Sequence, residues 1–351
     1  MKAPIFIVGT PRSGTTLIGR ILSQQAEIFI GGEMHFFEDI YARRQRLGDP
    51  ASPAAMQQIF ERLATLYGRY NARADQERID KLFADCDIVQ HLTTANRDYR
   101  DVLSRFMHLQ TCQAGKKRWG NHVPKEVFYV KDILSFYPEA KFIFCVRDIR
   151  DFLVSYQNRW RVATPGDSER FERLYHPIIT SLLWKATIKQ IALAESIIPV
   201  GNALTIQYES LVGEPVDTVQ RICRFIEEDY EDNLLQVDSH NSSFAVQESG
   251  IYTSSVGSRR DQLSQEEQYI AMRLAKKEMQ HLGYSTTRVT PQLGQLAKIG
   301  LTFPYALWRA LDANHVNRGP LLPYLSQRAM AFLPWAQRAA NTARHSHRKA
   351  R

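Results

Sequence analysis

Cysteine is scarce in this chain, with only Cys86, Cys112, Cys145 and Cys223 among 351 residues. None of the four forms a C-x-x-C pair or another zinc-ligand spacing, so neither a disulfide framework nor a zinc module is indicated. Sparse cysteines of this kind are typical of reduced, mostly buried thiols. We therefore expect a cytoplasmic protein, and we expect that it requires no metal.

Long apolar runs are also missing. No run approaches the ~18 residues that a membrane-spanning helix needs, and the apolar residues 5–8 are too few for a signal peptide. Acidic residues are nearly absent from residues 285–351, where Asp312 is the only acid among many arginines and lysines. The formal net charge of +8 favours anionic ligands or anionic surfaces. We expect no nucleic acid partner.

Short β-prone runs alternate with helical patterns along most of the chain. Residues 5–8, 141–146 and 203–207 are the clearest candidates for strands, whereas residues 119–124 are expected to form a loop. This alternation predicts an α/β, P-loop-like three-layer fold, in which helices flank a central parallel sheet. We expect one α/β domain over residues 1–284 with a helical insertion over about 45–118, followed by a basic, aromatic-containing helical extension over 285–351.

A glycine-bounded loop follows the first predicted strand and precedes a helical pattern. Gly9 and Gly14 have the G-x-x-x-x-G spacing with which backbone N–H groups surround a phosphate at a helix N-terminus. A nucleoside-triphosphatase loop would continue with a lysine, whereas Thr15 and Thr16 follow here. The loop has a cation of a different kind, Arg12, which lies between its two glycines. The loop therefore predicts a phosphate site that is poorly suited to hydrolysis of a triphosphate.

The string PIFIVGTPRSGTTLIGRIL, residues 4–22, resembles the 5′-phosphosulfate-binding loop of sulfotransferases that use 3′-phosphoadenosine 5′-phosphosulfate (PAPS). It is closest to the P-R-S-G-T-T form of bacterial and tyrosylprotein-type members. The resemblance implies PAPS as co-substrate and a sulfotransferase activity. It also implies that the phosphosulfate is held by Arg12, Ser13, Gly14, Thr15 and Thr16.

Three later segments extend the resemblance. Residues 141–160, KFIFCVRDIRDFLVSYQNRW, are similar to the family's 3′-phosphate segment, in which an arginine ends a strand and a serine follows eight residues later. Those residues are Arg147 and Ser155 here, although Ile149 replaces the usual proline. Residues 206–215 resemble a structural Tyr-Glu-x-Leu segment. Residues 251–264 resemble a late loop that closes over the nucleotide, which implies that Arg260 helps to hold the 3′-phosphate and that Arg259 is a weaker candidate.

Sulfuryl transfer by in-line displacement needs charge stabilisation, which Arg12 would provide, and a general base for the acceptor proton. Three residues compete as that base. Glu33 follows the first predicted helix, where tyrosylprotein-type enzymes place a catalytic glutamate. His122 resembles the histidine of cytosolic small-molecule sulfotransferases, and His35 is the third candidate.

Two other functions stay open at this point. One is a P-loop-type nucleotide kinase or NTPase, and the other is a non-catalytic protein that binds an anion or a membrane. For the second, the basic extension with Phe303, Trp308, Phe332 and Trp335 predicts peripheral membrane contact. The acceptor class is also open among small molecules, carbohydrates, lipids and peptides, and so is the oligomeric state.

Overall fold

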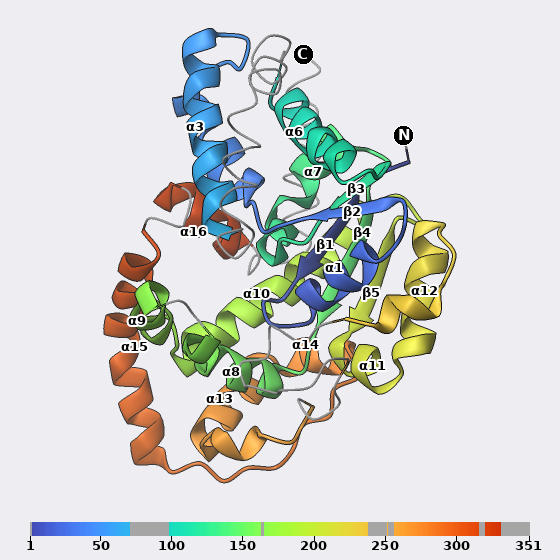
Figure 1. Cartoon of the computed structure of the whole chain (residues 1–351). Coiled ribbons are helices and arrows are strands. Elements are labelled where there is room, and N and C mark those ends of the chain that lie inside the picture. The colour runs from blue at the N-terminus through green and yellow to red at the C-terminus, as the bar shows by residue number, and fades with distance from the viewer. Residues whose placement is uncertain are drawn as a thin grey trace.

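The computed structural model describes residues 2–70, 98–162, 165–237, 251, 256–315 and 320–330. Within these residues, five parallel strands form one sheet in the order β2-β3-β1-β4-β5 (Figure 1). The predicted α/β fold with a central parallel sheet is confirmed. The strands are β1 (Ile5–Gly9), β2 (Ile28–Gly31), β3 (Arg118–Asn121), β4 (Lys141–Val146) and β5 (Ala203–Gln207).

Helices surround the sheet and connect its strands. The α-helices are α1 (Thr15–Ser23), α2 (Arg44–Leu47), α3 (Pro53–Tyr70), α6 (Tyr99–Gln113), α7 (Val130–Phe136), α8 (Ile149–Gln157), α9 (Pro165–Arg173), α10 (Pro177–Glu195), α11 (Tyr208–Gly213), α12 (Pro215–Ile226), α13 (Gln265–Leu274), α14 (Lys276–His281), α15 (Leu293–Ala313) and α16 (Leu321–Met330). A π-helix, η1, spans Phe36–Ile40. Short 3-10 helices are η2 (Tyr41–Arg43), η3 (Pro124–Tyr129), η4 (Arg159–Val162), η5 (Asp232–Leu235) and η7 (Arg260–Gln262).

The sheet is apolar on both faces because successive side chains of a strand point to opposite sides. Ile5 and Ile7 of β1 belong to the hydrophobic cluster that α1 and α12 complete. Phe6 and Val8 belong to the larger cluster, which includes Trp184 of α10. All five side chains are fully buried. Burial on both faces explains why β1 is a continuous apolar run, and it gives the three layers that the sequence predicts.

Gly9 ends β1 at a point where no side chain fits. Its φ is +139°, and a Cβ there would lie 2.2 Å from the carbonyl oxygen of Cys145 on β4. We expect Gly9→Ala to lower the free energy of unfolding by about 3 kcal/mol or more, since both backbone strain and overlap oppose it. Denaturant titration measures this. Gly213→Ala is the control, since a Cβ at Gly213 meets nothing within 4 Å, and equal stability losses in the two variants would contradict the prediction.

The strand β3 corrects one sequence-based expectation. Residues 119–124 read as a loop, because RWGN lacks an apolar run, but residues 118–121 pair with β2 and β1 inside the sheet. Gly120 allows β3 to lie against β2, because a Cβ at this position would lie only 2.6 Å from Ile30 Cδ1. Cross-strand packing thus decides this strand where intrinsic propensity does not. The strand places His122, the residue directly after it, at the carboxyl edge of the sheet.

The part of the chain that the structure describes after β5 includes α15 and α16, which lie outside the sheet and its covering helices. Ser264 and Glu267, which have capping-box spacing in the sequence, are bonded reciprocally at the start of α13. Beyond it, α15 packs on α9 and α10 (Figure 1), and Arg173 Nη2 pairs with Asp312 Oδ2 at 2.5 Å. The division into a domain over 1–284 and an extension over 285–351 stays a prediction.

The cysteines that the structure describes are free thiols. Cys145 and Cys223 are buried, and Cys112 is exposed, while Cys86 lies outside the described residues. Burial raises the pKa of the Cys145 thiol well above its ordinary value. The expected cytoplasmic location stays a prediction. Among the described helices, none is both long and apolar enough to cross a membrane.

Candidate active site

The loop between β1 and α1 has a fixed backbone conformation. Thr10 N–H donates to Cys145 O at 3.0 Å, and the hydroxyls of Thr10 and Ser13 are hydrogen-bonded to each other. Arg12 has a φ of 63°, and Gly14 has a φ of 89° in the left-handed region. Because Gly14 is the N-cap of α1 and has no side chain, no cap occupies the first-turn N–H groups. These groups lie where an anion is best stabilised.

The second predicted segment meets this loop directly. Arg12 Nε donates to Ser155 Oγ on α8 at 3.2 Å, and Arg147 Nη1 donates to Arg12 O at 3.2 Å. Arg147 itself is held at the end of β4, because Trp184 Nε1 donates to its carbonyl oxygen at 2.9 Å. The structure therefore brings together the residues that the sequence assigned to two phosphate groups.

The guanidiniums around the loop create an excess of positive charge. Burial, with smaller contributions from the neighbouring cations Arg159 and Arg147, lowers the pKa of Arg12 to about 10, while Glu33 opposes this shift. Cations that destabilise one another in this way favour a polyanionic ligand, which would neutralise them. The donor set, three arginines with a hydroxyl and helix N-terminal amides, fits a ligand with several phosphate or sulfate oxygens.

Arg159 is a site residue that the sequence reasoning missed. It lies in η4, with its guanidinium carbon 3.8 Å from the ring centre of Phe171 and 4.8 Å from that of Tyr156. The available signal was its spacing, since it follows Ser155 by four residues, or about one helical turn.

The Tyr-Glu-x-Leu segment supports this region from α11. The guanidinium carbon of Arg147 lies 4.3 Å from the centre of the Tyr208 ring. Glu209 Oε1 accepts the N–H of Asp148 at 2.9 Å, and Glu209 Oε2 accepts the hydroxyl of Tyr284 at 2.9 Å. These contacts fix the junction between β4 and α8, which agrees with the structural role expected for this segment.

Arg260 is positioned differently from the other predicted ligands. Its Nε and Nη2 each donate to a carboxylate oxygen of Asp151 at 2.8 Å, and Nη2 lies 3.2 Å from Asp148 Oδ2. The hydrogen bond to Asp151 raises the pKa of Arg260. Two carboxylates neutralise this guanidinium, so it fastens η7 to α8. Contact with a 3′-phosphate stays a prediction for Arg260.

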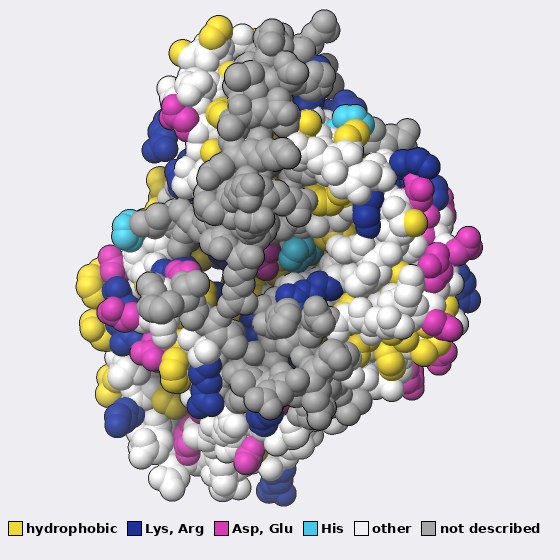
Figure 2. Space-filling model, viewed as in Figure 1, with side chains coloured by type: hydrophobic (Ala, Val, Ile, Leu, Met, Phe, Trp, Pro, Cys, Tyr) yellow, Lys and Arg dark blue, Asp and Glu magenta, His cyan; other side chains and the backbone are white. Residues whose placement is uncertain are grey.

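All three candidate bases lie at the carboxyl ends of β2 and β3. Gly31 and Asn121 are partners in the register of these strands, and His122 Nδ1 lies 2.8 Å from Gly31 O. His35 Nε2 lies 3.6 Å from Glu33 Oε2. Near the middle of the face in Figure 2, a histidine, an acidic and a basic side chain lie next to one another. The structure thus joins residues that the sequence treated as competitors.

The protonation states of the candidates differ. Burial lowers the pKa of His122, so the neutral ring prevails at pH 7. A carbonyl oxygen only accepts, so Nδ1 carries the hydrogen toward Gly31 and Nε2 is an acceptor. Burial raises the pKa of Glu33, but His35, His122 and Lys125 outweigh it, and the net shift is downward. The Glu33 carboxylate in turn opposes the lowering of the Arg12 pKa, so the two charges are close enough to interact.

Glu126 is a second carboxyl group near these residues, and it is fully buried. Asn121 Nδ2 donates to Glu126 Oε2 at 2.9 Å. Burial raises the pKa of Glu126 to about 8, against lesser opposing contributions from His35 and the Phe37 N–H. Glu126 is therefore mostly protonated at neutral pH and contributes no negative charge to the site there.

This protonation predicts a pH-dependent gain on replacing Glu126 with glutamine. Since the folded pKa is raised, the stability linked to the Glu126 proton is present below pH 4.5 and is lost as the pH rises through about 8. The neutral amide lacks this loss. We expect Glu126→Gln to gain roughly 2 to 4 kcal/mol over the parent between those pH values. Unfolding titrations across this range measure it, and a difference that is constant with pH would contradict the prediction.

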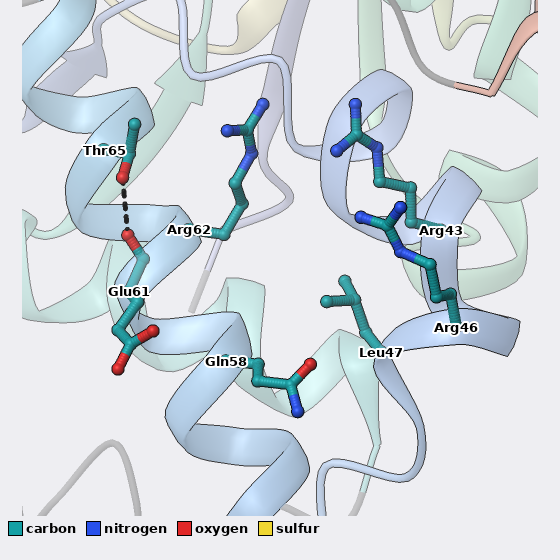
Figure 3. A pocket seen from close by; sticks show the side chains of 7 residues that line it. All are labelled: Arg43, Arg46, Leu47, Gln58, Glu61, Arg62 and Thr65. Carbon is teal, nitrogen blue, oxygen red and sulfur yellow. Dashed lines mark hydrogen bonds between the residues drawn. The ribbon is translucent and has the colours of Figure 1, made fainter.

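A pocket of about 290 Å³ lies beside this region, between α3 and the segment of η2 and α2. Figure 3 shows Arg43 and Arg46 reaching across it toward Arg62. The buried Asp39 carboxylate is hydrogen-bonded to Arg62 and lies 3.4 Å from Arg43 Nε. None of the predicted site residues lines this pocket. The lining residues are Arg43, Arg46, Leu47, Gln58, Glu61, Arg62 and Thr65.

Comparison with known proteins gives a match over most of the core. Residues 4–232 match the model of a family described as "Sulfotransferase family". The nodulation protein NoeE of Sinorhizobium fredii (strain NBRC 101917 / NGR234) is 25% identical over 337 residues, which are 90% of this chain and 69% of that protein. A Caenorhabditis briggsae protein named "Putative protein-tyrosine sulfotransferase" is 22% identical over 252 residues, 69% of this chain and 74% of that protein.

Among solved structures, the sulfotransferase domain from the curacin biosynthetic pathway has a similar fold. The two superpose with a TM-score of 0.52 at 19% identity, and the match covers 82% of this chain and 99% of that domain. At this identity the likeness speaks for the fold, and the match to residues 4–232 speaks for the family.

Proposed function

Since the chain belongs to the sulfotransferase family, we propose that it transfers a sulfuryl group from PAPS to a hydroxyl or amine of an acceptor. The observation that carries this proposal is the convergence of Arg12, Arg147 and Ser155 at the N-terminus of α1. A P-loop kinase or NTPase is disfavoured, because Thr15 stands where such a loop has its lysine.

The donor would be held by two sets of groups. The 5′-phosphosulfate binds to Arg12 and to the amides and hydroxyls of residues 13–16, at the helix N-terminus. The 3′-phosphate binds to Arg147 and Ser155, with Arg159 adding positive charge and Arg260 as a further ligand. PAPS supplies the activated sulfuryl group, and the protein stabilises the charge that grows on the departing phosphate.

Transfer requires one proton to leave the acceptor. The acceptor oxygen or nitrogen forms a bond to sulfur, the bond from sulfur to the phosphate oxygen breaks, and adenosine 3′,5′-bisphosphate leaves. We assign the proton to the Glu33 carboxylate, because its charge interacts with that of Arg12 and its side chain is one-third exposed. His122, through Nε2, is the alternative base.

The acceptor is a small molecule, carbohydrate, lipid or peptide that carries a hydroxyl or amine. The experiment that tests the activity supplies the purified chain and PAPS to a metabolite extract and searches by mass spectrometry for compounds that gain one sulfuryl group. We expect at least one such compound, and we expect it to be absent with an Arg12→Ala chain. No gain of sulfuryl groups in any extract, with PAPS intact, would contradict the activity.

We also propose peripheral contact of α15 with an anionic membrane. On this helix Leu301, Tyr305 and Trp308 are 83%, 62% and 60% exposed, and Figure 2 shows hydrophobic side chains along the edge where α15 lies in Figure 1. Aromatic and aliphatic side chains next to basic sequence are typical of interfacial helices.

Flotation with vesicles that contain anionic lipid tests this contact. We expect the chain to float. We expect Leu301→Ser/Trp308→Ser to reduce the bound fraction about tenfold, since two apolar side chains that would enter the membrane are lost. Equal flotation of both chains would contradict the contact. Cleavage of PAPS by the variant serves as the folding control.

A further inference from the structure

The helix α16 lies beyond residue 232, where the family match ends, yet it reaches the region of the candidate base. Arg328 on α16 donates from Nη2 to Glu38 Oε1 on η1 at 3.2 Å. The Arg328 side chain is only 14% exposed. A residue of α16 is therefore built into the surroundings of Glu33 and His35.

Glu38 is a buried carboxylate surrounded by cations. Its side chain is 1% exposed, and Lys125 Nζ lies 3.3 Å from Oε2. His35 Nδ1 lies 3.4 Å from the same oxygen. Burial raises the pKa of Glu38, but Lys125, His35 and Arg328 outweigh it, and the net pKa is well below the ordinary value. An ionised carboxylate in the interior depends on such partners, because an unpaired one costs several kcal/mol.

His35 connects this carboxylate with Glu33. Its Nδ1 faces Glu38 at 3.4 Å, and its Nε2 faces Glu33 Oε2 at 3.6 Å. The ring is thus held between two carboxylates, in a chain that runs from Arg328 through Glu38 and His35 to Glu33. His35 also has a φ of 49°, which is uncommon for a residue with a side chain and fixes where the ring begins.

Arg328 is itself fixed from two sides. Its guanidinium carbon lies 3.6 Å from the centre of the Tyr324 ring and 4.8 Å from that of Phe128 on η3. Its Nη1 also donates to Tyr324 O at 3.2 Å. A planar guanidinium satisfies stacking and hydrogen bonding at once, whereas the ammonium of a lysine supplies only the charge.

We propose that Arg328 is a positioning residue for the candidate base: by holding Glu38 in place, it keeps the His35 ring directed at Glu33. This inference rests on the proposed function, in which Glu33 takes the acceptor proton. Without Arg328, the ring is free to turn toward Glu38, and Glu33 loses the interaction that keeps it ionised and oriented. The helix α16 then sets the efficiency of transfer without touching either substrate.

The loss of Arg328 has a defined consequence for the pH profile. The charged groups that act on Glu33 are His35, His122, Lys125 and Arg12, and those that act on Glu38 are Lys125, Arg328 and His35, with Glu126 nearby. If His35 turns away, burial dominates at Glu33 and raises its pKa. A base acts in its deprotonated form. The acid limb of the pH profile, where kcat falls because the base becomes protonated, therefore moves to higher pH.

The test uses PAPS with water as the acceptor and follows release of inorganic sulfate by the full chain. We expect Arg328→Gln to lower kcat about tenfold, to move the acid limb upward by about one pH unit, and to leave the Kd of adenosine 3′,5′-bisphosphate unchanged. Arg328→Lys is expected to restore part of the rate. In Glu38→Gln/Arg328→Gln, kcat is expected to be no lower than in Glu38→Gln, since both residues act through one path.

Arg173→Gln is the matched control, because it removes the ion pair between α9 and Asp312 of α15 and leaves Glu38 untouched. We expect kcat of Arg173→Gln to fall at the same low pH as kcat of the parent. An unshifted limb in Arg328→Gln, or the same shift in Arg173→Gln, would overturn the proposal. If Glu33→Gln is itself fully active, the base assignment fails. If Glu33→Gln is inactive and Arg328→Gln matches the parent, only the role of Arg328 fails.

Discussion

Arg12→Ala is expected to lower kcat/KM for PAPS about a thousandfold, the scale of losing a charged group that stabilises a leaving oxyanion. Arg12 is the cation of the loop, and it bonds to Ser155 and lies beside Arg147. Burial, together with the nearby cations Arg159 and Arg147, lowers the pKa of its guanidinium to about 10. Bound phosphosulfate would remove that penalty, so transfer depends strongly on this side chain. Steady-state kinetics at varied PAPS concentration measure the effect.

Arg224→Ala is the control for net charge, since Arg224 is an exposed residue of α12. It is expected to keep near-parent kinetics. Arg12→Lys is expected to recover only a small part of the loss, because an ammonium lacks the forked donors of a guanidinium. Parent-like kcat/KM in Arg12→Ala would contradict the assignment of the loop.

Glu33→Gln is expected to lower kcat by about a thousandfold, within the range for a general base, with unchanged binding of adenosine 3′,5′-bisphosphate. The pH profile of the parent separates the two bases. The pKa of Glu33 lies below 4.5 and that of His122 below 6.5. An acid limb with its midpoint between these values assigns the titrating group to His122 and excludes Glu33, whereas a midpoint below 4.5 is the result expected for Glu33.

His122→Ala and Glu139→Gln complete this experiment. Glu139 is exposed in the turn before β4, so its amide variant controls for loss of one carboxylate. We expect His122→Ala to retain most of the parent kcat and to alter mainly the pH profile. Near-parent rates in Glu33→Gln together with a large loss in His122→Ala would move the role of base to the histidine.

The donor half of the site was predictable because its signals are local in sequence. The loop glycines, Arg12 and the first turn of α1 occupy consecutive positions, and Arg147 with Ser155 spans one strand end and one helix. Parallel strands bring their carboxyl ends to one edge, so the two segments meet there. Arg159 escaped only because it lies in η4, just after α8 ends.

The acceptor half was less accessible from sequence because it depends on pairing between distant segments. Glu33, His35 and His122 meet only because β3 pairs with β2, and β3 lacks the apolar pattern of a buried strand. The contact between Arg328 and Glu38 joins positions 290 residues apart. No local periodicity encodes such a contact, which tertiary packing alone determines.

We propose that the loop after β1 and the start of α8 bind a nucleotide with phosphates at both the 5′ and 3′ positions. Thermal unfolding of the full chain with saturating ligand tests this most directly, since a ligand that binds the folded state raises Tm. We predict a clear rise with adenosine 3′,5′-bisphosphate, none with ATP and magnesium, and loss of the rise in Arg147→Ala. Protection by ATP and magnesium without protection by the bisphosphate would contradict the claim.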